Sequence, residues 1–370
     1  MGGARQDTHD ESRFGPRRER LQSVLEDIDA DAIVVSHLPN VRYLCGFTGS
    51  AGLLLIESGA ATFFTDSRYT MQSKDEVFGA RIQVAKKGLL RAAGELLRSR
   101  RSLRRVAYSP AQMTVAQKQA LDAAVSRKIR WIDDQGAVER LRLFKDVYEI
   151  SAIRDAAAIV SKTFERARRI LRPGMTELNL AAEIERDFKR QGAEGPSFET
   201  IVASGERSAW PHARPSRKAI GKNELVVLDQ GAILRGYCSD MTRTVSVSKA
   251  SSKVRSLYAA VLEALEAGKA AVRPGVKAQD IDAAARSVLR RAGLAGYFTH
   301  STGHGIGLEI HEAPRLGRGD QTVLAEGMVV TVEPGVYIEG LGGIRIEDDI
   351  VVTARGAETI TTAPRNLIEI

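Results

Sequence analysis

Short apolar runs alternate with helical patterns over the first part of the chain. Apolar residues from Leu21 to Ile28 recur at the spacing of one helix face. The apolar runs that predict strands are Ala32–Ser36, Leu53–Ile56 and Ala61–Phe64. Strands that alternate with helices indicate an α/β domain. We expect this domain at residues 15–140, after a disordered tail at residues 1–14.

Longer helical patterns begin at Asp146. Apolar residues keep helical spacing over Glu149–Leu171, and Pro173-Gly174 ends the pattern. The same order of helix, Arg-Pro-Gly and helix recurs around Arg273-Pro274-Gly275. This recurrence indicates internal duplication within a second domain, which we place at residues 146–370.

The glycine-rich segment Gly46–Gly52 does not change this picture. Phosphate-binding loops of this kind end in Gly-Lys-Ser/Thr, which supplies a lysine and a magnesium ligand. That ending is missing here. We interpret the segment as a structural turn before the next strand.

The composition fits a globular protein with two cores. The chain has 370 residues, of which 43% are hydrophobic, and single cores stop growing at roughly 250–300 residues. Lysine and arginine number 54 against 46 acids, a net charge of +8. Part of this excess lies at Arg98–Arg105, where no aromatic residues interleave and no nucleic-acid motif follows. We interpret this run as a solvated helix end and expect no nucleic-acid partner.

Three features favour the cytoplasm. Cys45 and Cys238 are the only cysteines, which gives no disulfide framework and fits a reducing compartment. The segment Met1–Gln22 is charged throughout and lacks the apolar core of a secretory signal. The longest aliphatic run, Leu53–Ile56, is far shorter than the roughly 20 residues of a membrane-spanning helix. We expect a cytoplasmic protein without a membrane partner.

The candidate chemistry centres on the segment His300–Glu312. Three of the six histidines lie in it, with glycines between them that let the backbone approach a ligand closely. Two histidines four positions apart are also common on helix surfaces by chance. The pattern gains weight from four carboxylates in strand-like contexts, which are Asp229, Asp240, Glu333 and Glu347.

Asp229 and Asp240 belong to a predicted hairpin. Asp229 ends an apolar run, and Asp240 begins a segment that alternates at period two. If a two-residue turn at Leu234-Arg235 joins the strands, the two aspartates are directly opposed, with Cβ atoms about 5 Å apart. Opposed like charges are destabilising without a cation between them. A buried metal-binding pair therefore explains the apolar context of Asp229 better than a solvated hairpin does.

Glu333 and Glu347 form a similar pair. Glu333 ends the strand pattern that starts at Met328, and Glu347 lies in the returning segment Ile344–Ile350. Period-two alternation puts Arg345 on the same face as Glu347. A surface salt bridge is one interpretation of that neighbour. Beside a carboxylate-rich metal site, we expect Arg345 to fix the orientation of a carboxylate.

Four carboxylates and one imidazole fit a pair of divalent ions. Their negative charge is too large for one ion but suits two ions about 3.5–4 Å apart that activate a shared water. Ligation mostly by oxygen favours hard ions, so we expect Mn²⁺, with Co²⁺ or Zn²⁺ able to substitute. The lack of a cysteine ligand argues against a structural zinc site.

In this order and context, five residues resemble the ligands of the pita-bread metallopeptidases, the family of creatinase and methionine aminopeptidase. They are Asp229, Asp240, His304, Glu333 and Glu347. Flanking segments are similar to the Xaa-Pro aminopeptidase and Xaa-Pro dipeptidase (prolidase) subgroup, and these are Asn40–Ser50, Val202–Gly205, Pro211–Pro215, Ser239–Thr244, Gly303–Leu308 and Val332–Tyr337. The resemblance covers nearly the whole chain. It implies an α+β protein in which a pita-bread catalytic domain follows a smaller creatinase-type α/β domain.

The resemblance also implies how the ligands share the metals. Asp229 would hold one ion, and His304 with Glu333 would hold the second. Asp240 and Glu347 would bridge both ions, with a hydroxide between them. Glu333 would carry a proton from the bridging water to the leaving nitrogen.

Further residues match positions that line the substrate site in the family. Three histidines would contact the scissile carbonyl, the tetrahedral intermediate and the proline end, namely His212, His300 and His311. Arg345 is the expected support for a carboxylate. The proline ring needs an apolar niche, for which Trp210 and Tyr237 are the candidates.

These observations predict an Xaa-Pro aminopeptidase, which hydrolyses the N-terminal Xaa-Pro bond of peptides. A bond before proline is a tertiary amide without an N–H group, and activation of water by metals needs no such group. The alternative is an Xaa-Pro dipeptidase restricted to dipeptides. The family resemblance also implies a homodimer.

Other classes fit less well. A creatinase works without metal, and that branch has lost ligands that are present here. Methionine aminopeptidases share the ligands but do not usually carry a domain like residues 15–140. A non-catalytic pita-bread binding protein is disfavoured by the intact ligand set.

Overall fold

The computed structural model describes residues 10–126 and 128–370. The chain divides into two compact units, with the boundary between Arg142 and Leu143. The predicted tail lies partly outside the described residues, at residues 1–9. Its remainder needs correction, because helix α1 (Asp10–Asp27) already includes residues 10–14. Phe14 explains the longer helix, since its buried ring stacks on Phe78 with centroids 5.7 Å apart.

Unit 1 is an α/β structure. Its strands are β1 Ala32–Val35, β2 Leu53–Glu57, β3 Ala60–Thr65, β4 Arg81–Val84, β5 Arg105–Tyr108 and β6 Arg130–Asp133. Its helices after α1 are α2 Leu38–Cys45, the 3₁₀ turn η1 Ser67–Tyr69, α3 Gln72–Glu76, α4 Leu89–Ser99, α5 Val115–Val125 and α6 Ala137–Arg142. The three predicted strands are confirmed as β1, β2 and β3.

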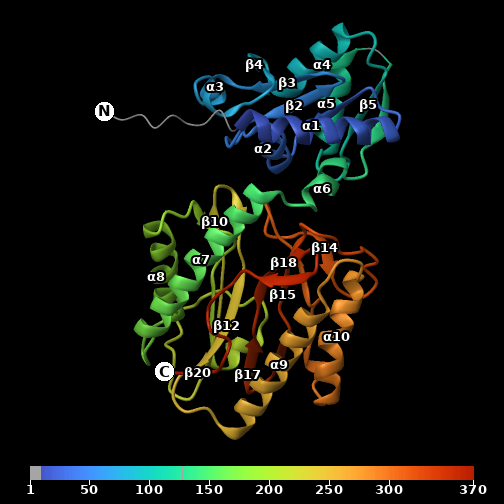
Figure 1. Cartoon of the computed structure of the whole chain (residues 1–370). Coiled ribbons are helices and arrows are strands. Elements are labelled where there is room, and N and C mark those ends of the chain that lie inside the picture. Colours follow the sequence, from blue (N-terminus) through green and yellow to red (C-terminus); the bar gives the residue numbers. More distant parts are fainter. Residues whose placement is uncertain (1–9, 127) are drawn as a thin grey trace. The chain divides into compact units, whose positions relative to one another are not determined.

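The strands of unit 1 form one mixed sheet in the order β4-β3-β2-β1-β5-β6. Val34 and Leu55 share a core with Leu97 of α4 and Leu121 of α5. Figure 1 shows α1 and α2 on the other side of the sheet. Because successive strand residues face opposite sides, a sheet covered on both faces requires apolar residues at every position. This explains the continuous apolar runs of β1 and β2, where β1 is buried throughout.

The arginine run lies at the end of α4 and the start of β5. Arg98 is in the last turn of α4, and Arg100 follows as its C-cap. Arg105 donates to the carboxylate of Asp31 at 2.7 Å. None of the described helices combines the length and apolar content that a membrane crossing requires.

Unit 2 contains four long helices, which are α7 Val147–Ile170, α8 Glu177–Arg190, α9 Ser252–Ala271 and α10 Ala278–Arg291. Two 3₁₀ turns are η2 Gly205–Ala209 and η3 Ala295–Tyr297. The strands are β7 Gly195–Pro196, β8 Ile201–Ser204, β9 Leu225–Gln230, β10 Ala232–Leu234, β11 Tyr237–Cys238, β12 Met241–Ser246, β13 Gly303–Gly305, β14 Glu312–Leu316, β15 Val329–Val332, β16 Gly335–Ile338, β17 Gly342–Arg345, β18 Asp348–Thr353, β19 Gly356–Thr359 and β20 Ile368–Glu369.

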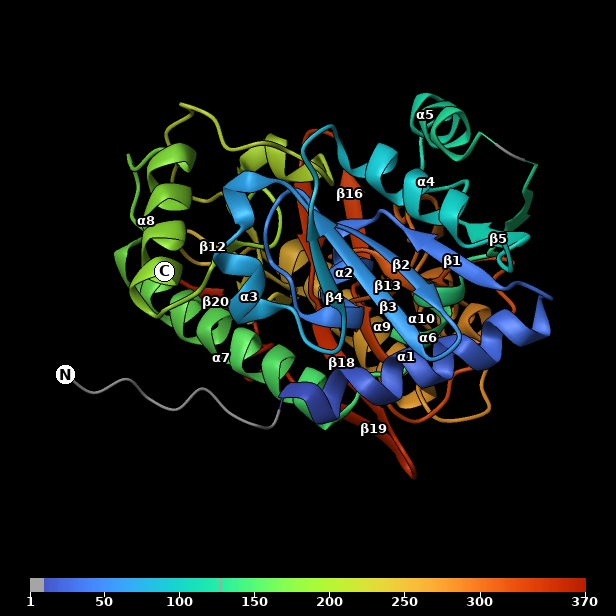
Figure 2. The ribbon, with the colours of Figure 1, turned by 90° about the horizontal axis from the view of Figure 1, so that it is seen from above.

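Two similar halves make up this unit, as the repeated Arg-Pro-Gly segment predicted. Gly174 links α7 to α8 at φ 86°, and Gly275 links α9 to α10 at φ 85°. Helices α8 and α10 are each 14 residues long. In Figure 1, α7 and α8 (green) cover one half of the strands, and α9 and α10 (orange) cover the other. Figure 2 shows the same separation of α8 from α10 from above.

Each pair of helices packs on its own sheet. One core joins α7 and α8 to β9 and β12, through residues such as Phe164 and Val226. The other joins α9 and α10 to β15 and β18, through residues such as Leu265 and Val330. The sheets have the strand orders β20-β12-β9-β8 and β14-β13-β15-β18-β19. They meet where the backbone N–H of Glu347 donates to the carbonyl of Thr242 at 3.1 Å.

The hairpin that carries Asp229 and Asp240 differs from the predicted register. Its two-residue turn is Arg235-Gly236, one position later than expected, with φ values of 52° and 82°. A tight turn of this kind needs positive φ at both central residues, which glycine adopts most easily. Asp229 therefore pairs with Thr242 instead of Asp240. The change of register is two residues, so both aspartates still face the same side.

Glu333 and Glu347 lie at an interruption of a second hairpin. Val332 pairs with Asp348 on one side of the interruption, and Gly335 pairs with Arg345 on the other. Glu333 therefore lies across from Glu347, where neither belongs to a strand. The ladder opens at this point because Pro334 has no N–H to donate.

Candidate active site

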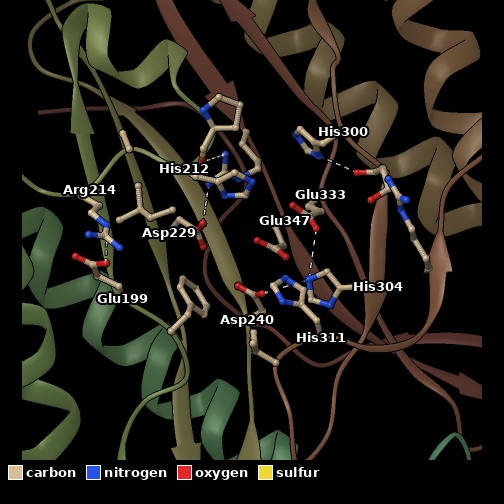
Figure 3. A pocket seen from close by; sticks show the side chains of 18 of the residues that line it. Glu199, His212, Arg214, Asp229, Asp240, His300, His304, His311, Glu333 and Glu347 are labelled. Carbon is tan, nitrogen blue, oxygen red and sulfur yellow. Dashed lines mark hydrogen bonds and ion pairs between the residues drawn. The ribbon is translucent and has the colours of Figure 1, made fainter. Parts of the chain in front are cut away.

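A cavity of about 650 Å³ in unit 2 contains the predicted chemistry. The predicted site residues that line it are His212, Asp229, Asp240, His300, His304, His311, Glu333, Arg345 and Glu347. Figure 3 shows Asp229, Asp240, Glu333 and Glu347 pointing toward a common centre. These residues are far apart in the sequence, and the two hairpins and the strand β13 bring them together in the fold.

His304 turns one imidazole nitrogen toward the carboxylates. Its Nδ1 is 3.0 Å from the Gly305 carbonyl and must donate to it, which leaves Nε2 as the free lone pair. Nε2 lies 3.7 Å from Asp240 Oδ2 and 3.6 Å from Glu333 Oε1. Burial lowers the pKa of His304 to about 4, so the ring is neutral at physiological pH. A neutral imidazole fixed by a backbone carbonyl is the form that binds metals.

The carboxylates have the chemistry of a cation site. Ligand atoms of Asp240, His304 and Glu347 lie within 4.8 Å of one another. Within the described residues, one oxygen each of Asp229, Asp240 and Glu347 is buried without a hydrogen-bond partner. Buried polar atoms are nearly always partnered. These oxygens therefore fit divalent ions as their missing partners.

The electrostatics of the cluster lead to the same conclusion. Burial, followed by the charge of Glu347, raises the pKa of Asp240 well above its usual value. Burial and then Glu333 raise the pKa of Glu347 in the same way. Burial also raises the pKa of Glu333 to about 7. Closely placed buried carboxylates cannot all ionise at low cost without compensating positive charge, and two divalent ions would supply it.

Arg345 is hydrogen-bonded to the carboxylate cluster. Its guanidinium donates to Asp229 Oδ2 at 2.7 Å and to the hydroxyl of Thr242 at 3.0 Å. The Thr242 hydroxyl in turn donates to Glu347 Oε2 at 2.6 Å. Arg345 thus contacts Asp229 directly and reaches Glu347 through Thr242. Each of these carboxylates keeps its other oxygen for the cavity.

A chain of hydrogen bonds runs from Arg345 to His300. Arg345 donates to the hydroxyl of Tyr337 at 2.7 Å, and that hydroxyl donates to His300 Nε2 at 2.8 Å. Nδ1 of His300 lies 2.7 Å from the Ser301 carbonyl, to which it donates. Burial and then the charge of Arg345 lower the pKa of His300 to about 4. The ring is therefore neutral and held in one tautomer.

His311 and His212 lie in the cavity with fewer constraints. The ring of His311 meets the ring of His304 edge to face, with centroids 4.4 Å apart. Burial lowers the pKa of His311, and the charge of His212 adds to this effect. His212 is exposed and lines the same cavity. Both rings can reach a ligand placed over the carboxylates.

The predicted proline niche needs correction, because Trp210 and Tyr237 are not among the residues that line the cavity. Trp210 is 59% exposed, with the guanidinium of Arg207 stacked 4.9 Å from its ring centroid. Tyr237 lies in β11 and is buried, and its hydroxyl donates to Glu149 at 2.9 Å. Tyr237 thus packs toward α7.

The structure adds residues that the sequence reasoning missed. The apolar side of the cavity is lined by Phe198, Ile201, Ala213 and Ile310, and its exposed charged rim is lined by Glu199, Arg214 and Arg315. Glu312 also lines the cavity, with a buried side chain. Ala213 and Ile310 lie inside segments already singled out for their histidines. Ile201 pairs with Asp229 across β8 and β9, so recognition of that strand neighbour could have found it. Figure 3 shows Glu199 and Arg214 on the side of Asp229.

Comparison with known proteins agrees with this geometry. The model of metallopeptidase family M24 matches residues 151–354, and the model of the creatinase/prolidase N-terminal domain matches residues 17–144. The chain is 36% identical to the Xaa-Pro dipeptidase of Pyrococcus furiosus, over 95% of this chain and 99% of that protein.

Solved structures of the same kind superpose closely. The Xaa-Pro dipeptidase from Bacillus anthracis has a TM-score of 0.93 and 39% identity, covering 96% of this chain and 100% of that one. The X-Pro aminopeptidase from Thermotoga maritima has a TM-score of 0.86 and 36% identity, covering 94% and 100%. The chain therefore belongs to metallopeptidase family M24, as a peptidase whose pita-bread catalytic domain follows a creatinase-type N-terminal domain.

Proposed function

We propose that this enzyme hydrolyses the N-terminal Xaa-Pro bond of peptides with the help of two divalent ions. The observation that carries the proposal is the set of orphaned, buried carboxylate oxygens around the free Nε2 of His304. The cavity around them also holds three further histidines and an apolar side. The names of the similar proteins support proline specificity.

The resemblance to the pita-bread metallopeptidases suggests how the ligands would share the ions. Asp229 would hold one ion, and His304 with Glu333 would hold the other. Asp240 and Glu347 would contact both. When bound, such a pair of ions activates a water molecule and polarises the scissile carbonyl. We expect Mn²⁺, because oxygen ligands predominate, and elemental analysis of the purified protein checks this.

The chain's own residues would manage the protons and the substrate. The Glu333 carboxylate would take a proton from the attacking water and give it to the proline nitrogen as that nitrogen leaves. His300, His311 and His212 would hold the substrate by hydrogen bonds. Because His300 already donates through Nδ1 and accepts through Nε2, it acts on a substrate chiefly by rearranging its bond with Tyr337.

The apolar side of the cavity is suited to proline and to the residue before it. Phe198, Ile201 and Ile310 offer contacts without polar atoms that would need partners. A site that recognises an amide through its N–H would leave that acceptor unpaired against proline. Comparison of an Xaa-Pro-Yaa peptide with the matched Xaa-Ala-Yaa peptide, using the Mn²⁺-loaded enzyme, tests the proposal. Equal cleavage of both would contradict it.

Aminopeptidase activity on longer peptides is the first proposal, and one feature favours dipeptides as a second candidate. A dipeptide carries a carboxylate on its proline, which calls for a cation at the rim. Arg315 lines the rim, and its guanidinium has no hydrogen bond or ion pair within the described residues. Arg214 is less available, because it pairs with Glu199 at 3.0 Å.

Substitution of Arg315→Gln should separate these candidates. If Arg315 binds the carboxylate of a dipeptide, KM for Xaa-Pro should rise about tenfold, since a charged hydrogen bond is worth roughly 1.5–3 kcal/mol and the site is partly solvated. KM for Xaa-Pro-Yaa amides should change little. The matched control is Arg214→Gln, for which we expect no such preference. Equal effects of Arg315→Gln on both substrates would exclude this role.

The predicted homodimer and the predicted cytoplasmic location also stay predictions. Light scattering on the purified protein measures the first. Fractionation of cells measures the second.

A further inference from the structure

Beside the cavity lies an ion pair to which neither the ligand pattern nor the proposed reaction gives a role. Lys145 Nζ lies 3.2 Å from Glu312 Oε2, and their side chains are only 1% and 7% exposed. Lys145 precedes α7, and its backbone N–H donates to the Gly327 carbonyl at 2.8 Å. Burying two charges costs about as much as their attraction returns, so such a pair adds little to stability. Its position suggests a different use.

Glu312 supports the short loop Gly307–His311 through its other oxygen. Glu312 Oε1 accepts a hydrogen bond from the backbone N–H of Glu309 at 3.1 Å. The carboxylate also packs against Gly307, where an added Cβ would lie 2.6 Å from both carboxylate oxygens. One carboxylate thus touches both the start and the middle of the loop. Lys145 holds that carboxylate in place from the opposite side.

The loop ends at His311, whose ring depends on the backbone for its position. Within the described residues, no hydrogen bond holds the His311 ring, which meets the ring of His304 edge to face. A ring without hydrogen bonds follows any movement of its own backbone. The loop backbone therefore decides where His311 lies over the carboxylates.

We propose that Lys145 and Glu312 are a positioning pair that fixes the Gly307–His311 loop and, through it, the imidazole of His311. Without Lys145, the buried carboxylate of Glu312 would lose the ammonium group that lies 3.2 Å from its Oε2. It would then take up a proton or turn toward solvent. Either change weakens the bond to the Glu309 N–H and loosens the middle of the loop, while the start of the loop keeps the bond from the Cys238 N–H to the Gly307 carbonyl at 2.8 Å. The effect on catalysis rests on the proposed function, whereas the effect on the loop does not.

The test combines hydrogen exchange with kinetics in the full-length enzyme. Lys145→Met keeps the length of the side chain and removes its charge, and Lys145→Arg restores the charge. Lys218→Met is a matched control, because Lys218 pairs with Glu224 at 2.6 Å, and neither lines the cavity. Mass spectrometry follows amide exchange in peptides that cover residues 305–312. Metal content is measured for each variant.

We expect Lys145→Met to speed exchange in this loop about tenfold, while Lys145→Arg and Lys218→Met stay within about twofold of the wild type. On an Xaa-Pro peptide, kcat should fall roughly 10- to 100-fold with little change in KM or in metal content, because displacement of an acting group by about 1 Å costs about that much. Unchanged loop exchange in Lys145→Met would overturn the proposal. So would a loss that Lys145→Arg fails to restore.

A double variant covers the case in which Lys145→Met folds poorly. Lys145→Met combined with Glu312→Gln leaves no buried lone charge, and it should lose less activity than the product of the two single losses. Losses that simply multiply would contradict coupling between the two residues. If the wild type itself does not cleave Xaa-Pro peptides, the proposed function fails, and the exchange experiment still decides on the pair.

Discussion

Asp240→Ala should abolish metal retention and peptidase activity together. Asp240 lies at the centre of the cluster, where its ligand atom is within 4.8 Å of those of His304 and Glu347. If Asp240 is shared by both ions as proposed, its loss should lower kcat/KM by about 10³-fold or more, since the activation of water depends on the pair. Activity assays and elemental analysis on the same preparation measure both effects.

The same substitution should not destabilise the metal-free fold. Burial and four neighbouring carboxylates raise the pKa of Asp240, which means that the cluster opposes its ionisation. Its removal relieves that repulsion, so the melting temperature without metal should equal or exceed that of the wild type. Asp155→Ala is the control, because Asp155 is an exposed acid paired with Arg235. An Asp240→Ala variant that keeps its metal and its activity would remove the proposed mechanism.

Asp348→Asn should produce the largest loss of stability. The carboxylate of Asp348 is fully buried and accepts from Arg243 at 2.9 Å, Lys269 at 2.9 Å and Arg365. Arg243 is itself only 1% exposed. Removal of the negative charge leaves a buried guanidinium without its counter-charge, which costs about 3–5 kcal/mol. For a unit of this size the melting temperature should fall by about 10 °C.

The pH dependence gives this prediction a second test. Burial alone would raise the pKa of Asp348, but Arg243, Lys269 and Arg365 outweigh it and lower the pKa to about 2, from an ordinary 3.8. A lowered pKa means that the carboxylate stabilises the fold fully above pH 3.8 and loses this effect as the pH falls toward 2. The difference in the free energy of unfolding between wild type and variant should therefore be constant from pH 7 to 5 and become smaller below pH 4.

Urea unfolding at several pH values measures this difference in the free energy of unfolding. Asp155→Asn makes the same change at an exposed ion pair, where the side chains of Asp155 and Arg235 are 57% and 36% exposed. Its effect should stay below about 1 kcal/mol. Equal effects of the two substitutions would show that the charge network around Asp348 does not stabilise the unit.

The acids of the site could be found from the sequence because strands impose a simple rule. A carboxylate at the end of an apolar run, as at Asp229, is buried wherever that strand pairs, so it needs a partner. The predicted face of each acid is correct although the predicted turn at Leu234-Arg235 is wrong. The resulting change of register is two residues, and side chains alternate with a period of two. Attention to the positive φ required at Gly236 would have corrected the register.

The niche for proline could not be found in the same way. Trp210 and Tyr237 lie close to predicted site residues in the sequence, but that proximity does not decide the direction of a side chain. Trp210 follows the 3₁₀ turn η2, and Tyr237 lies in the two-residue strand β11. Tyr237 turns toward Glu149, and Trp210 turns to solvent beside Arg207. The pairing of Lys145 with Glu312 could not be predicted either, because the two residues lie 167 positions apart in the chain.

The duplicated architecture of unit 2 has a consequence for its folding. Asp229 and Asp240 come from the half built on α7 and α8, whereas His304, Glu333 and Glu347 come from the half built on α9 and α10. Cations bound by ligands from both halves would link the two halves to each other. Separation of the halves on unfolding would release these ions. The free energy of ion binding would therefore also oppose that separation.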